Sequence, residues 1–156
     1  MEADDDIKRE VLGLVPQQPP FRFIDEIISL NENEIIGAYR FRKDEFFYQG
    51  HFPGRPITPG VILIEVMAQI GVVAFGMYLL ACRKNVRPAQ LNGPLSLFSL
   101  ADSIEFKGIV APGERVIVKG RKLYMRKGAL KVDAYMEREN GEVVCAGKLA
   151  GMGVDK

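Results

Sequence analysis

The sequence is poor in residues that bind metals or form crosslinks. Its 156 residues include one histidine, two cysteines and no tryptophan. Cys82 and Cys145 lie far apart in apolar surroundings, so the sequence contains neither a metal-ligand spacing nor a disulfide framework. We expect both cysteines to be free and buried, and we expect no metal and no other cofactor.

An excess of charge of either sign is also lacking. There are 21 basic and 20 acidic residues, a net charge of +1, which gives no reason to expect a nucleic-acid partner. The start, MEADDDIKRE, is acidic and polar and lacks the charged-then-apolar order of a secretory signal. The length and the 47% share of hydrophobic residues suit a single domain over residues 1–156. A cytoplasmic protein is expected.

The chain has only one long hydrophobic run, from Pro59 to Cys82. Its length would suffice for a membrane span. However, Glu65 and Gln69 lie inside it, and polar side chains are costly within a bilayer. We therefore interpret the run as a buried central helix and expect no membrane insertion. Thr58 is expected to cap this helix, with Pro59 at its first position.

Strand-like segments surround the central helix. A short helical segment within residues 1–15 precedes them, and the pair Asn140-Gly141 is a strong hairpin signal between the last two. The six expected strands cover residues 21–30, 34–41, 97–110, 114–124, 130–138 and 143–150. The pattern predicts an α+β fold in which a curled antiparallel sheet wraps around the helix. Such a sheet has an open edge, which dimerisation would protect.

The only histidine stands in a strongly constrained loop. Prolines at positions 53, 56 and 59 fix their own φ and restrict the residue before each of them, so the loop that holds His51 has little freedom. Glu65 and Gln69 follow on the helix, four residues apart and therefore on one face. Apolar neighbours should raise the pKa of Glu65 above its ordinary value. A histidine base and a protonated carboxyl group form a workable pair for proton transfer.

Each of these three residues also has a purely structural interpretation. A solitary loop histidine is often a satisfied structural residue. Glu65 could pair with an arginine from elsewhere in the chain, and Gln69 could merely satisfy a buried polar contact. The candidate arginines are Arg22, Arg40 and Arg42.

The run from Gln49 to Gln69, which contains G-H-F-P-G-x-P-x-x-P-G-V-x-x-x-E-x-x-A-Q, resembles the signature of the β-hydroxyacyl-acyl-carrier-protein dehydratases of the FabZ type. That family adopts the hot-dog fold. A glutamate at position 65 favours this type over the related dehydratase–isomerases, which carry aspartate there. Weaker similarities occur at Pro20-Phe21, Ile24-Asp25, Phe106-Lys107 and Ala111-Pro112-Gly113-Glu114.

The resemblance implies a reaction in fatty acid biosynthesis. The substrate would be a (3R)-hydroxyacyl chain on acyl carrier protein, and loss of water would give the trans-2-enoyl thioester. His51 would be the base and Glu65 the acid. In this family the two facing residues come from different subunits, so the active unit would be a homodimer, with a trimer of dimers left open.

Four further residues are expected to bind substrate. Backbone N–H groups in the first turn of a helix have no intrahelical partner, and Gly60 has no side chain to block a carbonyl, so its amide could stabilise the developing enolate. Its alternative role is only to permit the turn. Gln69, Phe52 and Pro59 complete the set.

The chain departs from the family pattern at three places. It has Phe46-Phe47-Tyr48 where Pro-Phe-Phe is common, Leu100-Ala101-Asp102 where Gly-Ile-Asp is usual, and Gly108-Ile109 where Arg-Pro is usual after Phe-Lys. These departures concern the contact with carrier protein and the chain-length preference rather than the chemistry. Two other functions also stay open: a different hot-dog thioester enzyme, such as an acyl thioesterase or an enoyl-CoA hydratase, and a non-catalytic hot-dog subunit.

Overall fold

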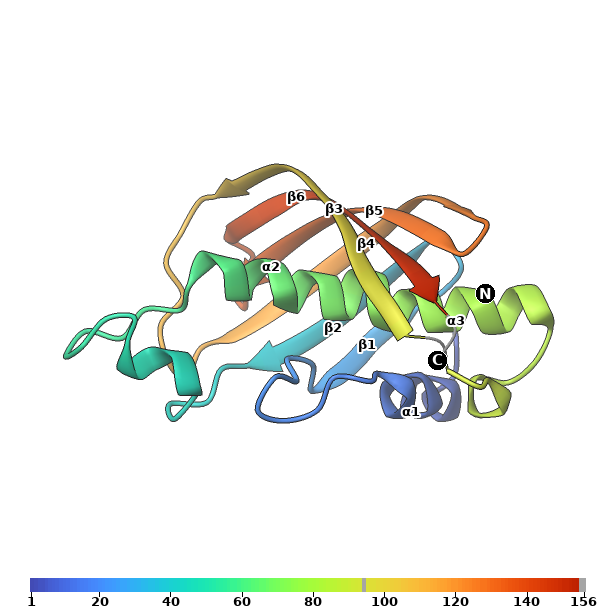
Figure 1. The fold of residues 1–156 in the computed structure, drawn as a ribbon, viewed down its shortest axis with the longest axis horizontal. Helices are drawn as coiled ribbons and strands as arrows, with labels where there is room; N and C mark the ends of the chain where they lie inside the picture. Colours follow the sequence, from blue (N-terminus) through green and yellow to red (C-terminus); the bar gives the residue numbers. More distant parts are fainter. Residues whose placement is uncertain (94, 155–156) are drawn as a thin grey trace.

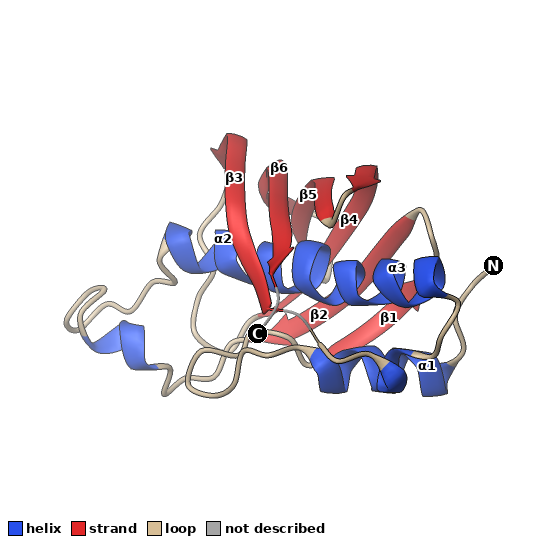
Figure 2. Cartoon of the chain, turned by 45° about the vertical axis from the view of Figure 1, so that its right-hand side comes forward, coloured by secondary structure: helices blue, strands red, loops and turns tan. Residues whose placement is uncertain are grey.

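Six antiparallel strands form one sheet that curls around a long helix (Figures 1 and 2). The structure is a computed structural model that describes residues 1–93 and 95–154, so three residues of the predicted domain lie outside the described part. The sheet order is β1-β2-β4-β5-β6-β3. The strands are β1 (Glu26–Leu30), β2 (Glu34–Arg40), β3 (Leu95–Phe106), β4 (Arg115–Arg126), β5 (Ala129–Arg138) and β6 (Val143–Val154). The predicted α+β arrangement is confirmed.

The helices lie on the inner side of the sheet and along its first edge (Figure 2). The first, α1 (Asp5–Leu14), begins at Asp4, whose carboxylate accepts a hydrogen bond from the Ile7 amide at 2.9 Å. The central helix consists of α2 (Gly60–Ala68), the π-helical segment η2 (Gln69–Ala74) and α3 (Phe75–Lys84). Two short 3-10 segments are η1 (Phe46–Gln49) and η3 (Pro88–Gln90).

The central helix differs from its prediction at its start. Pro59, not Thr58, is the N-cap residue, and no side chain caps this end. The predicted Thr58 cap is therefore wrong, because the Thr58 hydroxyl is bonded to the Tyr48 hydroxyl at 2.7 Å instead. The helix ends two residues later than expected, at Lys84, where Asn85 adopts the left-handed conformation with a φ of 54°.

Three strand boundaries were also predicted wrongly by four residues or more. One is the end of the last strand, which continues to Val154 instead of ending at residue 150. The first strand begins at Glu26 rather than at Phe21, because the backbone groups of Phe21 and Phe23 bond to the side chain of Gln69 instead of to a neighbouring strand. The third strand ends at Phe106, and the residues up to Val110 belong to the loop that leads to β4.

The long apolar helix belongs to the core. Its most apolar window of 18 residues is 72% buried inside the protein, as in the core helix of a soluble domain. Both cysteines are free; Cys145 is buried as expected, whereas Cys82 is only partly buried.

The backbones of the helix and the sheet lie close together where two glycines meet. A Cβ added at Gly120 in β4 would lie 3.1 Å from the Cα of Gly71 and 3.3 Å from a methyl carbon of Ile35. Gly71 lies in the π-helical segment, so this close contact is found in the helix just beyond Glu65 and Gln69.

We expect Gly120→Ala to lower the free energy of unfolding by about 1–3 kcal/mol, because the added methyl group must displace packed backbone. Urea unfolding followed by circular dichroism measures this. The matched control is Gly13→Ala in α1, where a Cβ would meet nothing within 4 Å and where helix propensity should raise stability by up to about 1 kcal/mol. Equal stability of the Gly120→Ala variant and the wild type would contradict the close packing.

Candidate active site

The loop that carries His51 extends beyond the N-terminal end of α2, at the left of Figure 1. It leaves η1 and is closed on itself by backbone hydrogen bonds. The His51 amide donates to the Phe47 carbonyl at 3.1 Å, and the Ile57 amide donates to the His51 carbonyl at 2.8 Å. Phe52 and Arg55 exchange two more, at 3.1 and 2.9 Å. The predicted restraint of this loop is thus visible in its hydrogen bonds.

The His51 ring is held in one tautomer. Its Nδ1 lies 2.8 Å from the carbonyl oxygen of Ile57. A carbonyl oxygen can only accept, so Nδ1 carries the hydrogen, and in the neutral ring Nε2 keeps its lone pair. The ring of Phe52 stacks on the imidazole at 4.2 Å between centroids, while Phe52 itself is 51% exposed. Nε2 is therefore the atom that can take a proton.

Pro59 and Gly60 form the turn into the helix. The buried Pro59 supplies the carbonyl that accepts the amides of Ile62 and Leu63, at 2.9 and 3.2 Å. Gly60 follows as the first helical residue. A Cβ on Gly60 would lie 2.8 Å from the ring of Phe106, so glycine at this position also makes room for that aromatic side chain.

Glu65 lies on the first turns of the same helix, partly buried among apolar residues. Burial raises the pKa of the Glu65 carboxyl group above its ordinary value of 4.5, and a hydrogen bond from Gln69 opposes part of that rise. The raised pKa agrees with the expectation from sequence. A protonated carboxyl group at this position can donate to a substrate.

Gln69 fixes the orientation of the Glu65 carboxyl group. It is completely buried, and its Oε1 accepts the Phe23 amide at 2.7 Å. Its Nε2 must then point the other way, where it donates to Glu65 Oε2 at 2.9 Å and to the Phe21 carbonyl at 3.0 Å. Oε1 of Glu65 is left to carry the acidic proton. Gln69 thus orients the acid and also satisfies buried backbone groups.

The three arginines considered as partners of Glu65 bond elsewhere. Arg22 donates to three carbonyls at the end of α1, Arg40 donates to the Gly113 carbonyl, and Arg42 pairs with Asp25. The interpretation that Glu65 neutralises one of them finds no support.

The structure brings Glu65 together with Gln69, and His51 together with Phe52. Within the described protomer, however, the side chains of His51 and Glu65 have separate hydrogen-bond partners, Ile57 and Gln69. Among the residues that the structure describes, no group of three or more histidine, cysteine or acidic side chains could hold a metal ion.

An apolar cavity of about 60 Å³ lies farther along the helix. It is lined by η2, α3, the β4–β5 hairpin, the start of β3 and the end of β6. Its lining includes Val72, Val73, Gly76, Met77, Leu80, Met125 and Leu130. The helix contributes to the lining from about two turns beyond Glu65.

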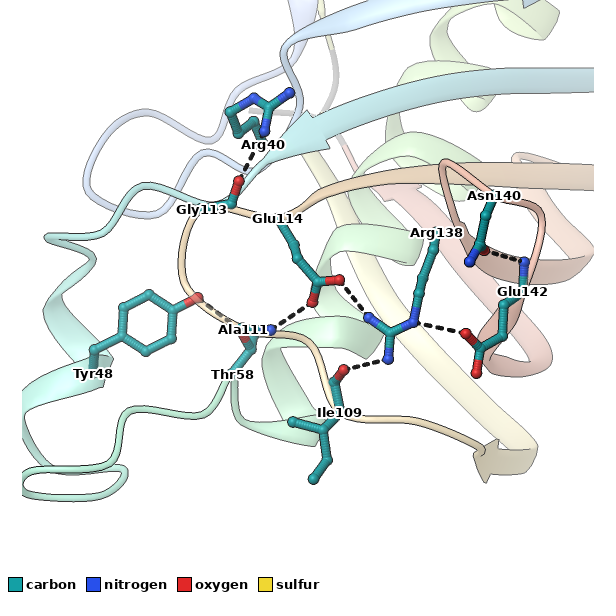
Figure 3. Close-up of polar contacts among 10 residues, drawn as sticks. All are labelled: Arg40, Tyr48, Thr58, Ile109, Ala111, Gly113, Glu114, Arg138, Asn140 and Glu142. Atoms are coloured by element: carbon teal, nitrogen blue, oxygen red, sulfur yellow. Dashed lines mark hydrogen bonds and ion pairs between the residues drawn. The ribbon is translucent and has the colours of Figure 1, made fainter.

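Sequence reasoning missed a polar network beside the loop that carries His51 (Figure 3). The buried hydroxyls of Tyr48 and Thr58 bond to one another, and Arg138 reaches across from β5 to the carbonyl of Ile109 at 2.6 Å. The only signal of this network in the sequence was the departure from the family pattern at Tyr48 and at Gly108. Neither departure indicates which residue its position contacts.

Comparison with known proteins identifies the family of the chain. Residues 15–148 match the FabA-like domain family. The chain is 34% identical to a 3-hydroxyacyl-[acyl-carrier-protein] dehydratase FabZ of Caldicellulosiruptor saccharolyticus, over 89% of this chain and 92% of that protein. It is 35% identical to a FabZ of Teredinibacter turnerae, over 91% and 97%.

Solved structures support the fold. The dehydratase heterocomplex ApeI:P of Xenorhabdus doucetiae is similar with a TM-score of 0.75 at 14% identity, over 94% of this chain and 91% of that one. A hypothetical thioesterase of Streptococcus pneumoniae, crystallised with coenzyme A, has a TM-score of 0.58 at 12% identity, over 99% and 98%. These likenesses establish the hot-dog fold. Taken with the sequence matches, they place the chain in the FabZ family of 3-hydroxyacyl-[acyl-carrier-protein] dehydratases, within the FabA-like domains.

Proposed function

We propose that this protein is a hydro-lyase of fatty acid biosynthesis that converts (3R)-hydroxyacyl-acyl carrier protein to the trans-2-enoyl thioester. The observation that carries the proposal is the partly buried Glu65, which Gln69 orients through a hydrogen bond and whose pKa is raised by burial, in a chain of the FabZ family. Elimination of water moves only protons and the leaving hydroxyl, so the proposal includes no cofactor.

The residues support the following sequence of steps. His51 Nε2 takes a proton from the carbon next to the thioester carbonyl, and the electron pair moves toward the thioester oxygen. The amide of Gly60, at the positive end of the helix, donates to that oxygen. Glu65 Oε1 gives its proton to the hydroxyl at the next carbon, which leaves as water, and the double bond forms between the two carbons. The proton on His51 then returns to Glu65 through solvent.

Pro59, Phe52 and Gln69 have supporting roles in this proposal. Pro59 places the Gly60 amide, Phe52 covers one face of the His51 ring, and Gln69 turns the acidic oxygen toward the substrate. The acyl chain would extend toward the apolar cavity beside α3, where Ser96 is the one polar side chain among the described residues of the lining.

A homodimer is the proposed active unit, with a trimer of dimers as the larger alternative. The edge strand β3 supports this, because it leaves large apolar side chains in solvent beside unpaired backbone groups. Exposed fractions are 39% for Leu95, 54% for Leu97, 44% for Phe98 and 41% for Leu100. Pairing of two such edges would bury them. We place this assembly in the cytoplasm, where acyl carrier protein would deliver the substrate.

The test is incubation of the purified protein with a (3R)-hydroxyacyl carrier protein. Dehydration forms a conjugated enoyl thioester and leaves the thioester bond intact. The ultraviolet absorbance of the enoyl thioester should therefore increase while a thiol reagent detects no free thiol. Release of thiol would instead identify a thioesterase, and absence of turnover would identify a non-catalytic subunit. Either result would contradict the proposal.

A further inference from the structure

The two ends of the loop that carries His51 are joined by one buried hydrogen bond. The hydroxyls of Tyr48, at the end of η1, and of Thr58, just before α2, lie 2.7 Å apart (Figure 3). Tyr48 is 5% exposed and Thr58 is 4% exposed. Burial raises the pKa of Tyr48 to about 12, so its hydroxyl stays protonated over the range in which the enzyme would work. His51 lies between these two residues in the chain, and Gly60 follows Thr58 by two positions.

The Thr58 end of this bond rests on a braced segment of the β3–β4 loop. The Thr58 amide donates to the Val110 carbonyl at 3.0 Å. On either side of Val110, the Ile109 carbonyl accepts from Arg138 at 2.6 Å and the Ala111 amide donates to Glu114 at 2.6 Å. Arg138 and Glu114 also pair with each other (Figure 3).

This brace passes close to a glycine where the family pattern has arginine. A Cβ on Gly108 would lie 3.2 Å from Arg138 Nη2 and 3.1 Å from a methyl carbon of Val144. Glycine at this position therefore leaves room for the guanidinium group of Arg138 to reach the Ile109 carbonyl. The position of Thr58 is fixed as a result. The hydrogen bond between Thr58 and Tyr48 then restrains the loop that carries His51.

The Tyr48 end is anchored as well. The Tyr48 amide donates to the Glu45 carbonyl at 3.2 Å, and the Tyr48 ring packs against Phe47 at 4.7 Å between centroids. The Glu45 carboxylate in turn accepts the Arg42 amide at 3.0 Å. The entry to the loop lacks one restraint, because Phe46 stands where the family commonly has proline and its φ is not fixed by a ring.

We propose that the Tyr48–Thr58 hydroxyl pair is a clasp that positions His51 relative to the Gly60 amide, in place of the restraint that proline at position 46 would supply. Both are positioning residues, since neither hydroxyl is free to contact substrate. The expected effect of the clasp on the reaction rate rests on the proposed function, whereas its expected effect on the His51 ring does not.

The test uses Tyr48→Phe, Thr58→Val and the double variant. Each single change leaves one buried hydroxyl without its partner and should lower the melting temperature, whereas the double variant removes both hydroxyls and should recover most of that loss. If the clasp positions His51, the double variant should still show a kcat about tenfold below wild type, with KM for the carrier-bound substrate within about twofold. Tyr124→Phe, at the far end of β4, is the control and should match wild type.

A second readout does not depend on turnover. Because His51 is the only histidine, protein without a histidine tag gives a single set of imidazole signals after ¹⁵N-histidine labelling. We expect the Nδ1–H tautomer to dominate in the wild type and to lose population in the double variant. Unchanged His51 signals would overturn the proposal even if the protein proved inactive. Recovery of kcat together with the melting temperature in the double variant would also overturn it, and would leave the dehydratase function intact.

Discussion

Replacement of His51 by alanine is expected to lower kcat by about two to four orders of magnitude, the range usual for a group that transfers a proton in the transition state. The reason lies in the Nδ1–Ile57 hydrogen bond, which leaves Nε2 as the basic atom in the neutral ring. Alanine offers no replacement for that atom. The rate of enoyl thioester formation at saturating carrier-bound substrate measures the loss.

The matched control for this change is Arg55→Ala, in the same loop. Arg55 is exposed and takes part in the loop through its backbone, which alanine retains. Activity within about twofold of wild type is expected there. If the His51→Ala variant worked as fast as the Arg55→Ala variant, the histidine would have only a structural role.

Glu65→Gln is also expected to reduce kcat by about two to four orders of magnitude, which is the usual effect of losing a general acid. Glutamine keeps the shape of the side chain and its carbonyl oxygen can still accept the Gln69 amide, so the fold should be preserved. The proton that would go to the departing hydroxyl is lost. Activity close to wild type in this variant would rule out Glu65 as the acid.

The same variant should change the pH dependence of stability. The folded protein raises the pKa of Glu65, so between the ordinary value of 4.5 and the raised value the folded state binds more protons than the unfolded state. Stability contributed by this group is therefore lost as the pH rises through that window. Glu65→Gln should be more stable than wild type at neutral pH, and the difference should shrink as the pH approaches 4.5. Urea titrations across this range measure it, and a constant difference would contradict the burial of the carboxyl group.

The parts of the site that follow local rules could be predicted from sequence. The proline-rich loop around His51 and the four-residue spacing of Glu65 and Gln69 depend only on backbone geometry over a few residues, and both are confirmed. The Asn140-Gly141 turn is local in the same way: the Gly141 amide donates to the Arg138 carbonyl at 3.0 Å.

Features that depend on distant partners could not be predicted. Thr58 resembles a helix cap, but Tyr48 takes its hydroxyl, and Phe21 lies in a strand-like run whose backbone is bound by Gln69, 48 residues later. The π-helical segment η2 was missed because a helix that is apolar nearly all round shows no periodicity that would mark an extra residue. The pairing of His51 with Glu65 remains a prediction for the same reason, since it requires a second copy of the chain.

Subunit mixing tests that pairing most directly. The His51→Ala and Glu65→Gln variants, each nearly inactive alone, are unfolded together and refolded so that the chains exchange. If each site takes His51 from one subunit and Glu65 from the other, a hybrid dimer contains one intact site, and random pairing should restore about a quarter of wild-type activity. A mixture in which hybrids are demonstrated but no activity returns would contradict the account.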